Sequence, residues 1–218
     1  MPSEVADPVT RRDRVASVLP CPDQPLSEKG LTGMSRHHSM DEDPTRRPNF
    51  MLTSCALEAI FGRLEPGAII LEMGSGDGTT ALIQHGFEVV SIEHDEAWAN
   101  LHPGTCILAP IVPTPAATAA EESGWYGLDP EDPSLPEEID LLLIDGPPGW
   151  IGRSGILDHP SLFERAKHIL IDDTDRPAEQ GLAERIFAMT NGSIEHVHSK
   201  QLNGRGLPRA FTWITPSR

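Results

Sequence analysis

A glycine-rich turn that follows an apolar run is the first segment of this sequence that could do chemistry. It reads LEMGSGDGTT, and its candidate ligand-binding residues are Glu72, Gly74, Ser75, Gly76, Gly78 and Thr80. Glycines at the junction of a strand and a helix let the backbone approach a ligand closely. The spacing is neither the G-x-G-x-x-G pattern of dinucleotide sites nor a P-loop, which needs a Lys-Ser/Thr pair. The alternative is a tight strand-to-helix turn that holds no ligand.

A second acidic residue, Glu93, ends the next apolar run, in the segment SIEHD. It follows the glycine turn by roughly 20 residues, the distance at which a nucleotide-binding sheet places a carboxylate that accepts both ribose hydroxyls. Together, the glycine turn and Glu93 indicate a cofactor that contains adenosine. His94 and Asp95 are expected to form a turn and a helix N-cap.

Three more carboxylates follow two further apolar runs: Asp145 in IDGPPG, and Asp172 and Asp173 in ILIDDTDRPAE. We expect them to converge, because the carboxyl ends of adjacent parallel strands line one crevice. Such a cluster suits Mg²⁺ or another divalent cation, which would polarise a substrate hydroxyl. Without a metal, Asp145 could act as a general base. Alternatively, one aspartate caps a helix, or a basic partner such as Arg176 balances the charge.

Other candidate residues have two interpretations each. Trp125 and Tyr126 could stack on an acceptor or close over the cofactor, or they could be a hydrophobic anchor for a long loop. His159 could be a catalytic base or bind substrate, or it could only precede a helix. Arg153 and Arg176 could bind an acidic acceptor or balance the nearby carboxylates.

The elements that must position these residues alternate along the chain. Apolar runs predict strands over 68–73, 87–93, 105–109, 139–145 and 168–172, and helical spacing predicts helices over 50–64, near TTALIQHG, near DEAWANL, over 161–167 and from Pro177 to Met189. A hairpin is expected over 193–215. This order predicts an α/β, Rossmann-like, doubly wound sheet of seven strands, mostly parallel, with an antiparallel last strand and helices on both faces.

Proline-rich segments interrupt this pattern twice. Residues 1–48 are expected to be largely flexible, and residues 49–218 to form the folded domain. Within that domain, residues 110–138 form a long acidic loop insertion that carries Trp125 and Tyr126.

Composition excludes several functional classes. The 218 residues hold 33 Asp and Glu against 17 Lys and Arg, a net charge of -16, which disfavours binding to nucleic acid or to a membrane surface. Apolar runs are too short for a transmembrane helix, and no secretory signal is evident. Cys21, Cys55 and Cys106 lack C-x-x-C spacing, so neither a disulfide framework nor a zinc site is indicated. We therefore expect a cytoplasmic protein.

The stretch from about residue 50 to 215 resembles the class I S-adenosylmethionine (SAM)-dependent methyltransferases. The resemblance rests on the glycine turn, which is similar to motif I of that class, an acidic residue before G-x-G-x-G. It implies SAM as cofactor, with the Glu72 carboxylate near the ammonium group of SAM and Glu93 at the ribose. One feature departs from the class: no acidic residue directly follows TCILA to contact the adenine amino group.

A finer resemblance concerns the acidic residues. Asp145, Asp172 and Asp173 are similar to the metal triad of catechol-type and macrocin-type O-methyltransferases, and IDGPPG with DDTDRPAE also resembles the glucuronoxylan 4-O-methyltransferase group and bacterial relatives associated with polysaccharide genes. This implies methylation of a hydroxyl on a sugar, glycan or small molecule. The lysine-bearing catalytic pattern of the catechol type is missing.

Two other functional classes stay open. A SAM-binding regulatory subunit would keep the glycine turn and lose the carboxylate cluster, and a nicotinamide-dependent oxidoreductase should show dinucleotide glycine spacing. As partners we expect a small-molecule or glycan acceptor, no nucleic acid and no membrane, and the sequence allows a homodimer.

Overall fold

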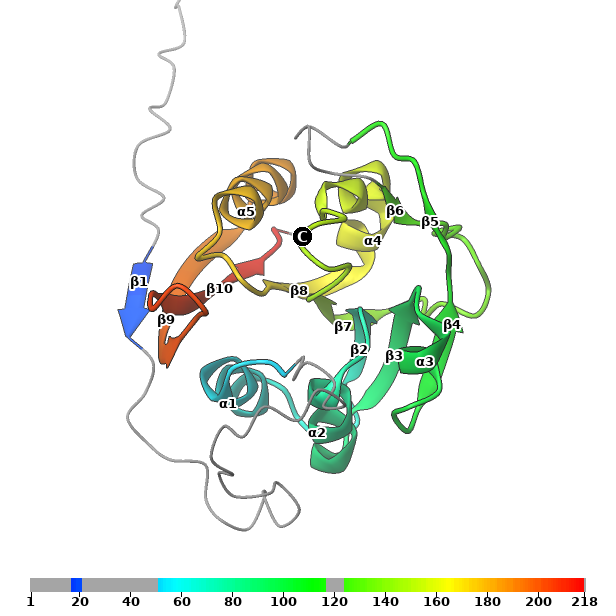
Figure 1. Ribbon diagram of the computed structural model, residues 1–218, viewed down its shortest axis with the longest axis horizontal. Helices are drawn as coiled ribbons and strands as arrows, with labels where there is room; N and C mark the ends of the chain where they lie inside the picture. The colour runs from blue at the N-terminus through cyan, green and yellow to red at the C-terminus, as the bar shows by residue number, and fades with distance from the viewer. Residues whose placement is uncertain (1–16, 21–50, 117–123, 218) are drawn as a thin grey trace, which may run out of the picture.

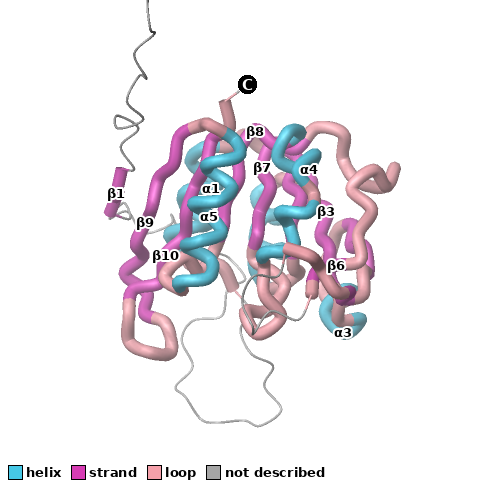
Figure 2. The backbone as a smooth tube through the Cα atoms, turned by 90° about the horizontal axis from the view of Figure 1, so that it is seen from above, coloured by secondary structure: helices cyan, strands magenta, loops and turns pink. Residues whose placement is uncertain are grey.

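The computed structural model describes residues 17–20, 51–116 and 124–217. Within these ranges an eight-stranded sheet forms the centre of the molecule, in the order β1-β9-β10-β8-β7-β2-β3-β4 (Figure 1). Its strands are β1 (Ser17–Pro20), β2 (Ile69–Met73), β3 (Glu88–Glu93), β4 (Thr105–Leu108), β7 (Ile139–Ile144), β8 (Ala166–Ile171), β9 (Ser193–Leu202) and β10 (Pro208–Thr215). Figure 2 shows the strands side by side across the molecule.

The predicted seven-stranded, doubly wound, Rossmann-like sheet is confirmed. Strands β4, β3, β2, β7 and β8 pair in parallel, and β10 pairs antiparallel with both β8 and β9. The eighth strand, β1, comes from the proline-rich segment and pairs in parallel with β9 at the edge of the sheet. A free strand edge offers unpaired backbone groups to such a segment. The rest of residues 1–48 lies outside the described residues.

Helices cover both faces of the sheet, as Figure 1 shows. One face carries α1 (Ser54–Arg63) and α2 (Asp77–His85), and the other carries α4 (Pro160–Arg165) and α5 (Pro177–Thr190). Two shorter helices, α3 (Glu96–Ala99) and the 3₁₀ helix η1 (Ser154–Asp158), follow β3 and β7. No helix in the described part of the chain is long and apolar enough to cross a bilayer.

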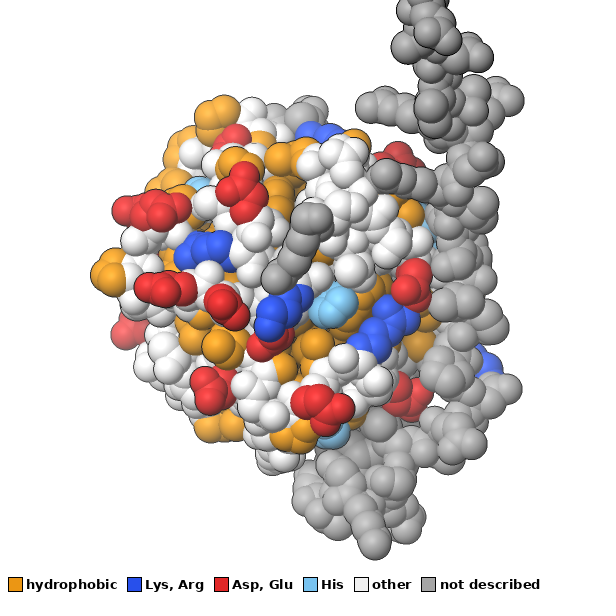
Figure 3. All heavy atoms as spheres, turned by 180° about the vertical axis from the view of Figure 1, so that it is seen from behind, with side chains coloured by type: hydrophobic (Ala, Val, Ile, Leu, Met, Phe, Trp, Pro, Cys, Tyr) orange, Lys and Arg blue, Asp and Glu red, His pale blue; other side chains and the backbone are white. Residues whose placement is uncertain are grey.

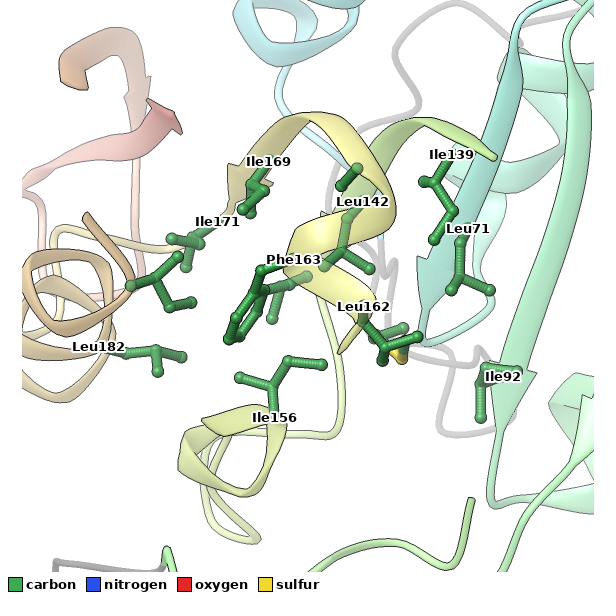
Figure 4. Packing of buried hydrophobic residues seen from close by; sticks show 14 of the residues in the cluster. Leu71, Ile92, Ile139, Leu142, Ile156, Leu162, Phe163, Ile169, Ile171 and Leu182 are labelled. Carbon is green, nitrogen blue, oxygen red and sulfur yellow. The ribbon is translucent and has the colours of Figure 1, made fainter. Parts of the chain in front are cut away.

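Alternate residues of the central strands supply two separate cores. In β7, Leu141 and Leu143 pack with the buried side of α1, whereas Leu142 and Ile144 pack with α4 and α5. This is the two-residue period of a strand that is buried on both faces, and it explains why the strands are continuous apolar runs. Figure 4 shows the second core, where Phe163 of α4 and Leu182 of α5 lie over Ile171 and its neighbours.

The structure describes most of the predicted loop insertion. Strands β5 (Ile111–Val112) and β6 (Trp125–Tyr126) form a two-stranded antiparallel sheet, and Leu128 and Leu135 are buried in the core. Residues 117–123 lie outside the described residues. Before that gap, Ile111 also packs against the core, so apolar side chains anchor the loop on both sides of it.

On the face seen in Figure 3, acidic side chains lie among apolar and basic ones, and the described residues form no continuous basic surface there.

Cys55 is disulfide-bonded, a bond that the cysteine spacing did not indicate, and Cys106 is a free thiol. A disulfide requires only that two cysteines approach in space, which sequence separation does not reveal.

Substitution of two glycines should test how tightly the loop packs. A Cβ on Gly155 of η1 would overlap Cβ and Cγ of Trp125, whereas a Cβ on Gly181 of α5 would meet no atom within 4 Å. We expect Gly155→Ala to lower the free energy of unfolding by about 1–3 kcal/mol through overpacking. Gly181→Ala should raise it by about 0.5–1 kcal/mol, because alanine favours helix. Chemical denaturation measures both, and stabilisation by both variants would refute the packing of Trp125 on η1.

Candidate functional site

The carboxyl ends of β2, β3, β7 and β8 meet at one edge of the sheet because these strands are parallel. The glycine turn leaves β2 there. Gly74 has a φ of +98°, which disfavours any side chain, and a Cβ on it would lie 3.2 Å from Cα of Gly146, in the turn after β7. The two turns therefore touch through their backbones, and this contact places the glycine turn beside Asp145.

Glu93 is fixed by backbone donors on both sides. Its Oε2 accepts a hydrogen bond from the Ser75 N–H (3.0 Å), and its Oε1 accepts from the N–H groups of His94 (2.7 Å) and Asp95 (2.8 Å). Asp95 caps α3, as predicted, by accepting from the Ala97 N–H. A carboxylate has about four acceptor positions. Nδ1 of His94 also lies 2.7 Å from Oε1, so the capacity for a further donor, such as a ribose hydroxyl, is at Oε2, which accepts only from Ser75 among the described residues.

Glu72 lies beneath the glycine turn and is almost completely buried. Its Oε2 accepts hydrogen bonds from the hydroxyls of Thr79 in α2 (2.7 Å) and Ser91 in β3 (2.6 Å). Burial raises its pKa to about 7, although the two hydroxyls act in the opposite direction. Glu72 therefore braces the turn against β3, and its contact with a cofactor ammonium stays a prediction.

The raised pKa of Glu72 predicts a pH-dependent stability. A folded-state pKa near 7 against 4.5 for the free side chain means that protonation stabilises the fold below pH 4.5, and that this stabilisation is lost as the pH rises to about 7. Glu72→Gln removes the ionisation. We expect its unfolding free energy to exceed that of the wild type by up to about 3 kcal/mol at pH 8, and by much less at pH 4.5. Urea titrations at both pH values measure this, and an equal difference at both would contradict the assignment.

The three predicted aspartates converge. One carboxylate oxygen from each of Asp145, Asp172 and Asp173 lies within 4.8 Å of the others, so the three could hold a metal ion. Asp172 and Asp173 are buried, and the Asp145 side chain is 25% exposed. Asp173 has a φ of +60°, in the left-handed region that non-glycine residues rarely adopt and that is common at functional sites.

Three arginines surround this cluster. The buried Arg153 lies with Nη2 3.1 Å from Oδ2 of Asp173 and 3.5 Å from Oδ1 of Asp145. Arg209 of β10 donates to Oδ2 of Asp172 at 2.8 Å, and Arg176 lies 3.0 Å from Oδ2 of Asp173. The alternative of basic partners, which includes Arg176 as predicted, is therefore realised. The sequence analysis did not identify Arg209, because this residue reaches the cluster only through the pairing of β10 with β8.

Burial and mutual repulsion shift the acidity of the cluster. Burial, followed by the neighbouring Asp172 charge, raises the pKa of Asp145 well above its usual value, against the lowering effect of Arg153. Burial and Asp173 raise the pKa of Asp172 to about 6, while Arg209 and Arg153 act to lower it. Both carboxyls are thus better proton acceptors than an ordinary aspartate.

Tyr126, on β6 of the loop insertion, contacts the turn after β7 that bears Asp145. Its ring is buried, and a Cβ on Gly146 would overlap its hydroxyl. Burial and the Glu93 charge raise the pKa of the tyrosine. The hydroxyl has no hydrogen-bond partner among the residues that the structure describes. A buried polar group usually has a partner, so this atom marks a place where a polar ligand group would fit.

Other predicted site residues lie elsewhere or have a packing role. Trp125 is 1% exposed and belongs to the core, which favours the interpretation as an anchor. The Thr80 hydroxyl lies 2.9 Å from Nδ1 of His102, and Gly78 packs against Leu52. Burial lowers the pKa of His159, and the charges that act on it are those of Asp158 and Asp129, outside the carboxylate cluster.

The residues at this edge fit SAM. The Glu93 carboxylate and the Tyr126 hydroxyl, which has no partner among the described residues, are of the types that would hold a ribose and an amino-acid group. For a divalent cation the oxygens match in number and spacing, and the buried Oδ1 of Asp172 has no hydrogen-bond partner among the described residues. Guanidinium groups, however, already contact one oxygen of each aspartate. The charge of the site therefore does not fit a resident divalent cation.

Comparison with known proteins finds no matching family model and no matching curated protein. Solved structures with a distant likeness include the O-methyltransferase TomG from Streptomyces achromogenes in complex with SAM, at 15% identity and a TM-score of 0.47, over 78% of this chain and 83% of that chain. A second is an rRNA methylase from Streptococcus thermophilus, at 13% identity and a TM-score of 0.47, over 80% and 99%. A third is the C-terminal domain of precorrin-6Y C5,15-methyltransferase from Rhodobacter capsulatus, at 14% identity and a TM-score of 0.45, over 77% and 91%. Likeness at this level decides nothing about the chemistry of this chain.

Proposed function

We propose that this protein is a SAM-dependent methyltransferase that methylates a hydroxyl oxygen of a sugar, glycan or small molecule. The observation that carries the proposal is the contact between the glycine turn and the turn that bears Asp145. The two backbones are so close that a Cβ added to Gly74 would lie 3.2 Å from Cα of Gly146. It sets a candidate cofactor site, ending in Glu93, directly beside a carboxylate that can accept a proton.

Each residue has a defined task in this proposal. When bound, SAM supplies an electrophilic methyl group. The Glu93 carboxylate holds the ribose hydroxyls, and the backbone N–H groups of Ser75, His94 and Asp95 fix that carboxylate in place. Asp145 accepts the proton of the acceptor hydroxyl, for which its raised pKa suits it. The buried hydroxyl of Tyr126 donates a hydrogen bond to the bound molecules, and its ring excludes water.

Asp145 has one oxygen available for this proton transfer. Its Oδ1 faces Arg153, whereas Oδ2 has no hydrogen-bond partner in the described ranges of the chain. The side chain is partly exposed, so an acceptor can reach it. A general base must lie within hydrogen-bond reach of the proton that it takes, so the proposal requires an acceptor hydroxyl that binds within that reach of Oδ2.

Methyl transfer is tested with methyl-labelled SAM and a panel of sugars, oligosaccharides and phenols. We expect label in a product that resists alkali, because an ether survives conditions that hydrolyse a methyl ester. Alkali-labile label would show that the acceptor is a carboxylate. If S-adenosylhomocysteine binds but label is transferred to no member of the panel, the regulatory, non-catalytic alternative gains support.

A further inference from the structure

The Arg153 guanidinium lies at the centre of the carboxylate cluster. It is 4% exposed, and its nitrogens donate to four backbone carbonyls as well as to carboxylates. Nε donates to the Pro147 carbonyl at 3.2 Å and Nη1 to the Asp172 carbonyl at 3.0 Å, and the other two carbonyls are those of Ile144 and Asp145. These bonds tie together the turns after β7 and β8. Arg153 is therefore fixed in place by the fold.

The same guanidinium contacts the oxygens that would bind a metal ion. Its Nη2 lies 3.1 Å from Oδ2 of Asp173 and 3.5 Å from Oδ1 of Asp145. A magnesium ion needs such oxygens at about 2.1 Å and a calcium ion at about 2.3–2.6 Å. An ion at that distance from these oxygens would lie beside a permanent positive charge that cannot lose its proton.

The charge of the cluster is already compensated. Arg209 contacts Asp172 and Asp173, and Arg176 contacts Asp173 and Glu179. The two differ from Arg153 in exposure, because the Arg176 side chain is 47% exposed and that of Arg209 is 24% exposed. Solvent screens exposed ion pairs strongly and buried ones weakly. Arg153 is therefore the cation that Asp145 and Asp173 cannot exchange for another.

We infer that the Arg153 guanidinium, between the carboxylates of Asp145 and Asp173, and Arg209, on that of Asp172, take the place that a divalent cation would take in this cluster, so that the site needs no metal ion. Arg153 is then a positioning residue: it holds Oδ1 of Asp145 and leaves Oδ2 toward the acceptor. The positioning of Asp145 rests on the proposed function, whereas the replacement of a metal ion does not, because cation binding is measured on the protein without cofactor or acceptor.

The first test is titration of the full chain with Mn²⁺, followed by the electron paramagnetic resonance signal of the free ion. Wild type and Asp173→Asn are compared. We expect no difference between them, because the cluster holds no manganese in either. Binding that is at least tenfold tighter in the wild type would locate a metal ion in the cluster and overturn the inference.

The second test removes the guanidinium. Arg153→Met keeps an unbranched side chain and leaves the carboxylates without their fixed cation. We expect it to bind Mn²⁺ at least tenfold more tightly than the wild type, and we expect Mn²⁺ to raise its Tm but not that of the wild type. If Arg153→Met is unfolded without Mn²⁺, recovery of its folded circular dichroism spectrum on addition of Mn²⁺ would also show that the variant binds manganese. Arg205→Met, in the exposed turn between β9 and β10, is the matched control and should bind as the wild type does.

A folded Arg153→Met variant that binds Mn²⁺ no better than the wild type would contradict the inference, since vacant carboxylates would then attract no cation. Should the variant stay unfolded with and without Mn²⁺, the comparison of wild type with Asp173→Asn decides the matter alone. Neither test uses turnover, so a failure here is distinguishable from a failure of the methyltransferase proposal.

Discussion

Replacement of Glu93 by alanine is expected to weaken the binding of S-adenosylhomocysteine by roughly 100-fold or more. Each hydrogen bond between a charged carboxylate and a ribose hydroxyl contributes about 1.5–3 kcal/mol, and each 1.4 kcal/mol is about tenfold in affinity. The substitution also removes the acceptor for three backbone N–H groups, those of Ser75, His94 and Asp95. Isothermal titration calorimetry measures the change.

The matched control for this prediction is Glu88→Ala, at the exposed, opposite end of the same strand. We expect it to bind S-adenosylhomocysteine as the wild type does. Equal loss in both variants would indicate a general loss of structure in β3. Unchanged binding in Glu93→Ala would remove Glu93 from the cofactor site.

Replacement of Asp145 by asparagine should have the opposite pattern: unchanged S-adenosylhomocysteine affinity and a turnover that falls by roughly 10²–10⁴-fold. Asparagine keeps the shape of the side chain but cannot accept the hydroxyl proton as a base. In the wild type, kcat/KM should fall as the pH drops through the pKa of Asp145, which burial and Asp172 hold well above 3.8. The acidic limb of the profile should be absent from the residual activity of Asp145→Asn.

Asp140→Asn is the control for this second prediction. Asp140 lies near the other end of β7, where it accepts from the Ile69 N–H and pairs with Lys167, so its loss should affect stability more than turnover. If Asp145→Asn lowers the cofactor affinity as much as it lowers turnover, the division of roles between Glu93 and Asp145 is wrong.

The sheet was predictable because strands buried on both faces are continuous apolar runs, as in β7, and because glycine turns separate them from helices. The convergence of Asp145 with Asp172 and Asp173 followed from the rule that parallel strands end at one edge. The role of Arg209 could not be predicted, because it depends on β10 lying between β9 and β8. Strand order is a property of the tertiary fold, not of local spacing.

Other features depend on contacts that no local pattern encodes. Trp125 could have faced an acceptor or the core, and only its packing against Gly155 decides for the core. Strand β1 is only four residues long, and no hydrophobic periodicity predicts it. It could not be predicted from its own residues because it forms by pairing with the edge of β9. The sequence left two roles open for Arg153, to bind an acidic acceptor or to balance the nearby carboxylates, and only its contacts with Asp145 and Asp173 in the fold decide for the second.

The most direct test of the central claim is calorimetric titration of the purified protein with S-adenosylhomocysteine, once in EDTA and once with added magnesium. Binding at a one-to-one ratio with a Kd on the order of micromolar, the same in both conditions, is the result that we predict. The absence of binding in both conditions would contradict the assignment of the glycine turn and Glu93 to SAM, and would make a nicotinamide-dependent or non-enzymatic role the better explanation of this fold.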